Sequence, residues 1–130
     1  MSKKWRDRGQ SAVELALLLP LLLMLLLGAI DLSRAFGTWM ILSNAAREGA
    51  RYGSGHPYDS WDIEYYTIQE VEAEGIAGED VDLDVDFPSG MDAGEPIIVQ
   101  LSYDLELLTL GLFGGAPVTI RAKAEMMILG

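Results

Sequence analysis

Residues 11–30 read SAVELALLLPLLLMLLLGAI and form the most apolar run of the chain. From Leu15 to Ile30 it holds ten leucines and no charged side chain. Together with the three residues before Leu15, the run makes ~28 Å of helix at ~1.5 Å per residue, close to the ~30 Å hydrocarbon layer of a bilayer. The stretch therefore predicts one transmembrane helix, with expected bounds at residues 10–30.

A single carboxylate, Glu14, breaks the apolar character of this stretch. An ionised side chain inside a membrane costs roughly 2.5–3.5 kcal/mol on insertion scales, so it usually serves a partner or a function. Gly9 lies five residues before Glu14, and a peptidase that cuts after Gly9 would leave Gln10 as the new N-terminus. The leader before Gly9 contains Lys3, Lys4, Arg6 and Arg8. This spacing is typical of a class III, prepilin-type signal, so we expect residues 1–9 to be removed.

The basic leader also predicts the orientation of the span. Only Asp7 opposes its positive charges, which places the N-terminus in the cytoplasm and everything beyond about Asp31 outside. The alternative is an ordinary secretory signal peptide, since Ser33-Arg34-Ala35 loosely meets the small-x-small rule for cleavage. The apolar core is longer than such peptides usually have, and the helical pattern continues through that cut. We therefore expect a single-pass anchor in the cytoplasmic membrane.

Composition bounds the part outside the membrane. The chain has 130 residues and no cysteine, which leaves room for one small domain without disulfides or thiolate chemistry. Its formal net charge is −11. From Asp59 onward, sixteen acidic residues face only Arg121 and Lys123, so nucleic acid is excluded as an expected partner because phosphate binding needs the opposite charge.

The helix is expected to continue beyond the membrane through residues 31–55. Apolar or small residues recur there at helical spacing, so span and extension together predict a rod of about 42 residues. Pro20 should kink or locally loosen it. The turn-forming sequence from Gly53 to Pro57 should end it.

Two patterns mark the end of this rod. Ala45, Gly49 and Gly53 are small residues four apart, which let another backbone approach closely, either a partner helix or the chain's own sheet. We expect the charged residues of this segment to form a solvated ion-pair edge on the exposed side of the helix. They are Arg47, Glu48 and Arg51.

Residues 56–130 predict a small acidic α+β domain. Asp59 or Ser60 can cap a second helix that stops at Gly75. We expect its apolar stripe to pack on a sheet; the stripe consists of Trp61, Tyr65, Ile68 and Val71. Alternating apolar residues predict three antiparallel strands near 81–87, 96–105 and 117–128, with an apolar connection from Leu105 to Gly115.

The acidic first strand is the remaining candidate site. It presents Asp80, Asp82, Asp84 and Asp86. These carboxylates favour Ca²⁺ chemically, but alternate side chains on a strand lie ~6.5–7 Å apart, so a solvated surface is the preferred interpretation and no metal is expected. His56 is the lone histidine and has no metal-ligating companion, and no catalytic set or phosphate loop appears. We expect neither an enzyme nor a cofactor.

Taken together, these motifs resemble the TadE-like family of pseudopilins. The resemblance rests on Gly9 with the sequence from Gln10 to Glu14, on the leucine-rich helix through Asp31, and on the segment Ala45-Ala46-Arg47-Glu48-Gly49-Ala50-Arg51. One departure is Leu15, where many relatives of this pilus system have an aromatic residue. The family implies a minor, pilin-like subunit of the tight-adherence (Flp, type IVc) pilus, with roles in adhesion and biofilm formation. It also implies membrane lipid, a prepilin peptidase, other Tad pilins and pilus-assembly platform proteins as partners.

In such a subunit, Glu14 would pair in the assembled fibre with the amine that cleavage creates on a neighbouring subunit. The main alternative is an uncleaved, signal-anchored cell-surface protein whose outer domain binds a partner or cations. A membrane-tethered enzyme is a third and weaker hypothesis.

Overall fold

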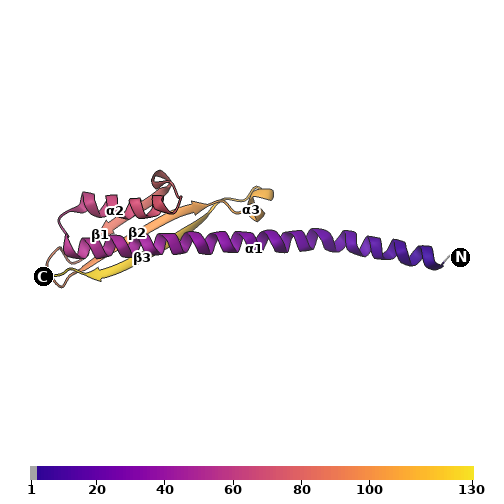
Figure 1. Cartoon of the computed structure of the whole chain (residues 1–130), viewed down its shortest axis with the longest axis horizontal. Helices are drawn as coiled ribbons and strands as arrows, with labels where there is room; N and C mark the ends of the chain where they lie inside the picture. The colour runs from indigo at the N-terminus through magenta and orange to yellow at the C-terminus, as the bar shows by residue number, and fades with distance from the viewer. Residues whose placement is uncertain (1–2) are drawn as a thin grey trace.

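The computed structural model describes the backbone of residues 3–130 and the side chains of residues 9–130. Met1, Ser2 and the side chains of the basic leader therefore lie outside the described residues. One long helix carries a small domain along one of its halves, as Figure 1 shows. The elements are α1 (Lys3–Gly55), α2 (Ser60–Ala73), η1 (Gly78–Asp80), β1 (Val81–Asp86), β2 (Pro96–Leu105), α3 (Leu108–Leu112) and β3 (Val118–Met127).

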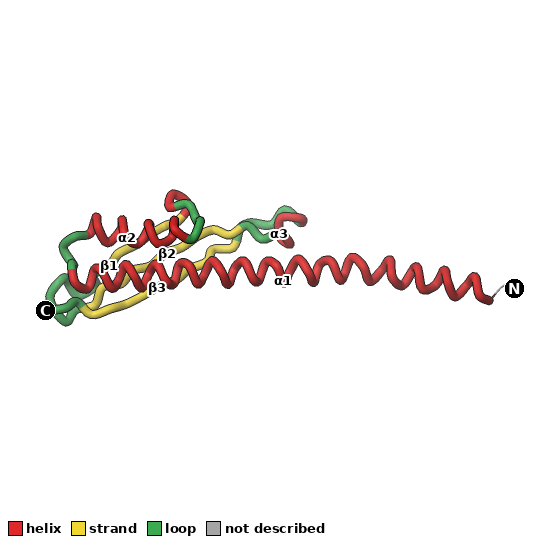
Figure 2. Tube along the Cα trace, viewed as in Figure 1, coloured by secondary structure: helices red, strands yellow, loops and turns green. Residues whose placement is uncertain are grey.

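Helix α1 is continuous over 53 residues, or ~80 Å at ~1.5 Å per residue. It runs through Pro20 without a break, and Figure 2 shows a gently curved tube with no sharp bend. The expected kink is therefore not seen. Leucines flank the proline on both sides and are strong helix formers, so the helix continues around the one missing N–H group. The end of the helix at Gly55 confirms the predicted turn.

The sheet has three antiparallel strands in the order β1-β2-β3, which confirms the predicted α+β class. All three strands fall within the predicted ranges. In the register, Val85 pairs with Val99, and Leu101 pairs with Ala122. Because side chains alternate along a strand, this register gathers the apolar residues on the face toward α1.

The core lies between this apolar face and the second half of α1. Leu42, Ala46 and Ala50 of α1 are fully buried, as are Ile97, Val99 and Leu101 of β2. On β3 the buried residues are Ala122 and Ala124. Alanine on both sides lets the helix lie close to the sheet, and dense packing of this kind is what stabilises a small core.

Helix α2 confirms the predicted burial of Val71 but not that of the aromatic residues. Its buried face is Ile63, Thr67 and Val71, whereas Trp61 is 77% exposed and Tyr65 is 50% exposed. The helix lies mainly against α1 rather than on the sheet. A Cβ at Gly49 would overlap Thr67 Oγ1, so α2 approaches α1 closely at this point.

The two ends of α2 also differ from each other in how well they were predicted. Asp59 precedes the helix, but its side chain makes no capping hydrogen bond. The first turn is closed instead by the Ile63 N–H, which donates to the Asp59 carbonyl oxygen at 3.0 Å. At the other end, Gly75 has a φ of +87°, a conformation that glycine adopts without strain, which confirms the predicted stop.

The apolar connection after β2 contains a short helix, α3, that was not predicted from the sequence. Figure 1 shows α3 beyond the end of the sheet, on the side toward the N-terminus of α1. It contacts α1 there. This contact brings Leu108 of α3 beside Asp31 of α1, which lies 77 positions earlier in the chain.

Candidate functional site

The first half of α1 is the candidate membrane anchor. Among the described residues it is the one helix long and apolar enough to cross a membrane, and its apolar run is not buried inside the protein. Leu17, for example, is 73% exposed. A continuous apolar surface of this length has no place in water, whereas a bilayer solvates it and the helix satisfies its own backbone groups.

Glu14 lies on this bare part of α1, one turn after the predicted cleavage site. Gly9 and Gln10 are helical and exposed, and Gln10 Nε2 donates to Glu14 Oε1 at 3.2 Å. An amide donor satisfies one oxygen of the carboxylate but does not neutralise its charge. Among residues 9–130, the two ion pairs lie elsewhere, at Arg34–Asp31 and Arg51–Glu48. Glu14 therefore has no counter-charge within the described side chains.

A second carboxylate on α1, Asp31, has its partners within the fold. It is only 4% exposed. Its Oδ1 accepts the N–H of Leu108 at 2.8 Å, and its Oδ2 accepts the N–H and the hydroxyl of Thr109 at 2.8 and 2.7 Å. Asp31 thus joins the end of the apolar run of α1 to the start of α3.

Arg34 completes this contact. Its Nη1 lies 3.5 Å from Asp31 Oδ1 and donates to the Glu106 carbonyl oxygen at 3.0 Å. Burial alone would raise the pKa of Asp31. The hydrogen bonds from Thr109 and Leu108, together with the charge of Arg34, outweigh burial and hold the pKa below its ordinary value of 3.8. The carboxylate is therefore held in its ionised form.

The Asp31 contact was not predicted from the sequence. The only signal was a carboxylate directly after the apolar run, which was used to mark the edge of the membrane. A lone Asp at that position is compatible with simple exposure to water, and its partners lie 77 and 78 residues away. Only the fold brings them together.

The small residues at the end of α1 contact the chain's own elements. Ala45 is fully buried. Gly49 faces Thr67 of α2, and a Cβ at Gly53 would overlap the side-chain end of Ile97 on β2. These positions therefore lie at the contact of α1 with both α2 and the sheet, and within the domain they are not open to a partner helix.

The charged residues beside them lie on the opposite, solvated side. Arg51 Nε donates to Glu48 Oε2 at 3.0 Å, and a second contact joins Arg51 Nη2 to Glu48 Oε1. The hydrogen bond from Arg51 lowers the pKa of Glu48, and the same bond raises the pKa of Arg51. Arg47 is exposed beside this pair. An exposed i,i+3 pair of this kind is screened by solvent and contributes little to stability.

The acidic first strand lies along one edge of the sheet. Asp82, Asp84 and Asp86 are exposed on the outer face of β1, and Asp80 ends the preceding turn η1. Across the sheet they face Ser102, Gln100 and Ile98 rather than further carboxylates. Among the described residues, no group of three or more His, Cys, Asp or Glu side chains could hold a metal ion.

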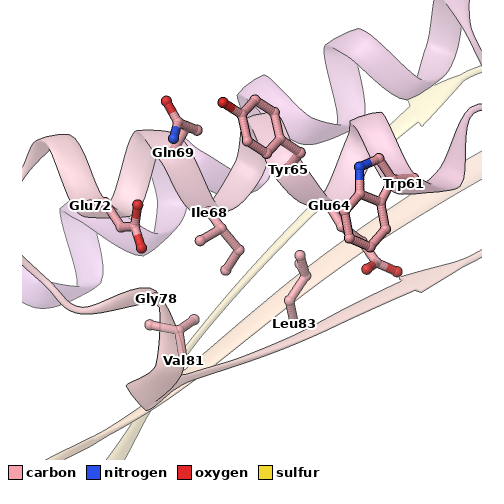
Figure 3. Close-up of a pocket in the computed structure, with 9 residues that line it drawn as sticks. All are labelled: Trp61, Glu64, Tyr65, Ile68, Gln69, Glu72, Gly78, Val81 and Leu83. Carbon is pink, nitrogen blue, oxygen red and sulfur yellow. The ribbon is translucent and has the colours of Figure 1, made fainter.

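The exposed aromatic residues of α2 line a shallow groove of about 500 Å³ between α2 and β1. Figure 3 shows Trp61, Tyr65 and Ile68 on the helix above Val81 and Leu83 on the strand, with Glu64 and Glu72 at the rim. This surface was missed because the aromatic residues were expected to be in the core.

His56 lies at the end of α1, where its ring stacks on Tyr52 with centroids 4.6 Å apart.

Comparison with known proteins bears on the first half of this description. Residues 9–51 match the family model of TadE-like proteins. Searches of curated proteins and of solved structures gave no significant match. The matched residues contain Gly9, Glu14 and Asp31, and they end four residues before the end of α1. The resemblance seen in the sequence is thus confirmed over residues 9–51, about a third of the chain, which form a TadE-like segment.

Proposed function

We propose that the chain is a membrane-anchored, minor pilin-like subunit for the assembly of a tight-adherence (Flp/Tad) pilus. In this proposal a prepilin peptidase removes residues 1–9, residues 10–30 span the cytoplasmic membrane, and the N-terminus faces the cytoplasm. Residues 31–55 continue the helix outside, and residues 56–130 form the outer domain. The TadE-like segment and the apolar helix support the proposal.

The observation that carries the proposal is the position of Glu14. It is the one charged residue between Gly9 and Ile30, and it follows the predicted cleavage site by one helical turn and one residue. Its described partner, the Gln10 amide, leaves the negative charge in place. A carboxylate kept at this cost indicates that its counter-charge comes from another molecule.

Cleavage after Gly9 would provide that counter-charge. It creates a free amine at the N-terminus of α1, and the amine of one subunit can lie beside Glu14 of its neighbour when the apolar helices pack together. A buried charge that is paired only in the assembly is unfavourable in the free subunit and favourable in the fibre. Assembly then becomes selective for correctly processed subunits aligned in register.

The proposed partners follow from this step. They are membrane lipid before assembly, the prepilin peptidase at the leader, and other Tad pilins and pilus-assembly platform proteins afterwards. The outer domain would remain on the surface of the fibre or membrane, where adhesion and biofilm formation take place. Its acidic charge keeps that surface soluble and disfavours nucleic acid as a partner.

The experiment is deletion of the gene, followed by return of the wild-type chain carrying a C-terminal tag. We expect deletion to reduce surface pili and attachment, the tagged chain to restore both, and the tagged chain to co-purify with the major pilin from membranes. Normal pili in the deletion strain, together with a chain that keeps Met1, would contradict the proposal.

That contrary result would favour an uncleaved, signal-anchored surface protein. The groove between α2 and β1 is the observation on its side, because Trp61 and Tyr65 expose aromatic rings beside the unpaired edge of β1. Exposed aromatic residues are enriched at protein interfaces. In that case the outer domain would be the functional part, and the helix would serve only as its anchor.

A further inference from the structure

The segment around α3 exposes an unusual amount of apolar surface for an acidic domain. Residues 107–117 read LLTLGLFGGAP and contain no charge, and the next charged residue is Arg121. Leu112 is 68% exposed and Phe113 is 72% exposed, with Leu108 at 45%. Contiguous exposed apolar surface of this kind indicates an interaction site.

The position of this segment along α1 identifies what it faces. The Leu108 and Thr109 N–H groups are bound to Asp31, which directly follows the last apolar residue of the span. Figure 1 shows α3 extending past the end of the sheet toward the N-terminal half of α1. Leu27 and Gly28 are half-buried, whereas the other residues from Gly9 to Ile30 are exposed. The segment therefore reaches the level of the membrane span itself.

The hydrogen bonds at Asp31 hold this arrangement at the boundary. Both carboxylate oxygens are satisfied by α3, and Arg34 ties the preceding Glu106 carbonyl to the same turn of α1. A charged pair at the edge of the apolar run, with its hydrogen bonds satisfied by the protein, meets the requirement that polar groups near hydrocarbon be paired. The exposed apolar side chains of α3 are then held next to the end of the apolar run of α1.

We propose that residues 107–117 form a second membrane contact, in which Leu112 and Phe113 insert into the outer leaflet next to the transmembrane part of α1. The occupant is lipid because α3 is bound to α1 at Asp31, the residue that follows the apolar run, so its exposed apolar side chains lie next to the span. The inference rests on the membrane anchoring in the proposed function. Its consequence is that the outer domain lies against the bilayer in one orientation rather than swinging on a free helix.

The chain has no cysteine, so single labels test this directly. Gly111→Cys places a spin label on α3 and Gly55→Cys places one at the far end of α1; an added Cβ meets no atom within 4 Å at either position. Leu22→Cys reports on the span. Each full-length variant is reconstituted at low density in phosphatidylcholine vesicles, and collision of the label with oxygen and with a water-soluble nickel chelate is measured.

We expect labels at 22 and 111 to favour oxygen, as in lipid, and the label at 55 to favour the nickel chelate. In the background Leu112→Asp with Phe113→Asp, the label at 111 should move to the aqueous class. Leu129→Asp, an equally exposed apolar site at the other end of the domain, should leave it unchanged.

An aqueous label at 111 beside a lipid-like label at 22 would overturn this inference and leave the anchor intact. An aqueous label at 22 would overturn the anchoring itself. A label at 111 that becomes shielded only as protein density rises would show that α3 contacts a second subunit, and the lipid contact would be wrong.

Discussion

The two halves of α1 are one continuous helix in two different environments. In the first half, leucines cover every side of the helix, and Leu17 is 73% exposed. In the second half, one face is buried by the sheet and α2, and Leu42 is fully buried. The second half therefore has its partners within the chain, whereas we expect the first half to find them in lipid or in other subunits.

Two carboxylates of α1, Glu14 and Asp31, repeat this difference. Asp31 is buried, accepts three hydrogen bonds and lies beside Arg34. Glu14 is exposed on the bare half and is bound only by an uncharged amide among the described side chains. We therefore expect substitution of Glu14 to affect assembly between molecules, and substitution of Asp31 to affect the fold of one molecule.

The largest expected effect is that of Glu14→Ala on assembly. Removing one member of a buried charge pair typically costs ~2–5 kcal/mol, which is more than a tenfold loss of association. Membrane insertion should be unchanged or improved, because the carboxylate is unfavourable in lipid. Quantitative co-purification with the major pilin and counts of surface pili measure the loss, and membrane fractionation measures insertion.

The matched control is Glu48→Ala, which removes a carboxylate from the second half of the same helix. It breaks only the exposed pair with Arg51, so assembly should remain near the parental level. If Glu14→Ala assembled normally and Glu48→Ala did not, the comparison would be reversed, and subunit recognition would lie in the outer half of α1.

The next largest effect is expected on the stability of the domain. Gly49→Ala places a methyl group onto Thr67 Oγ1, and such overpacking typically costs ~1–3 kcal/mol. Gly37→Ala is the control, because its Cβ meets no atom within 4 Å and alanine favours the helix by up to ~1 kcal/mol. Thermal unfolding of the full chain in detergent, followed by circular dichroism, compares the two. Equal midpoints would mean that α2 does not pack closely on α1.

A smaller and local effect is expected at Asp31. Its lowered pKa means that the ionised form favours the folded contact, so the contribution is present above the ordinary pKa of 3.8 and is lost as the pH falls through the lowered value. Hydrogen exchange of the Leu108 and Thr109 amides should therefore stay slow down to about that pH. Asp31→Asn should speed their exchange at neutral pH while leaving the amides of β2 protected. Unchanged exchange at Leu108 would contradict the contact.

The smallest effect is expected from calcium. Because the outer carboxylates of β1 face Ser102 and Gln100 rather than each other, millimolar Ca²⁺ should leave the thermal midpoint nearly unchanged. Binding to the folded state alone would raise it. A saturable rise with Ca²⁺ but not with Mg²⁺ would show that Asp82 and its neighbours form a cation site.

What the sequence predicted well was local. The strands and α1 follow from periods of two and 3.6 residues, which neighbouring residues encode by themselves. The aromatic part of the predicted α2 stripe was wrong because Trp61 and Tyr65 were given more weight than Ile63 and Thr67, whereas the burial of Val71 was predicted correctly. Helix α1 approaches α2 closely at Gly49, and this close approach favours the α2 face that contains Thr67.

The Asp31 contact could not be predicted from the sequence for a related reason. Its partners on α3 lie 77 residues further along, in a connection whose apolar sequence looked like a loop. No sequence pattern at Asp31 identifies α3 as its partner, and none on α3 identifies Asp31. The role of Glu14 was inferred from its distance from Gly9 and from the apolar run around it, and it stays a prediction.

Mass spectrometry of the mature N-terminus decides whether the first half of α1 is processed as a pilin-like assembly helix. If the bare half of α1 is a pilin-like assembly helix, the chain isolated from membranes or fibres begins at Gln10 and keeps a free or methylated amine that can pair with Glu14 of a neighbour. An N-terminus at Met1, or one at Phe36 after cleavage of the whole span, would contradict the claim. A mature chain that begins with pyroglutamate at residue 10 would confirm cleavage but contradict the charge pairing.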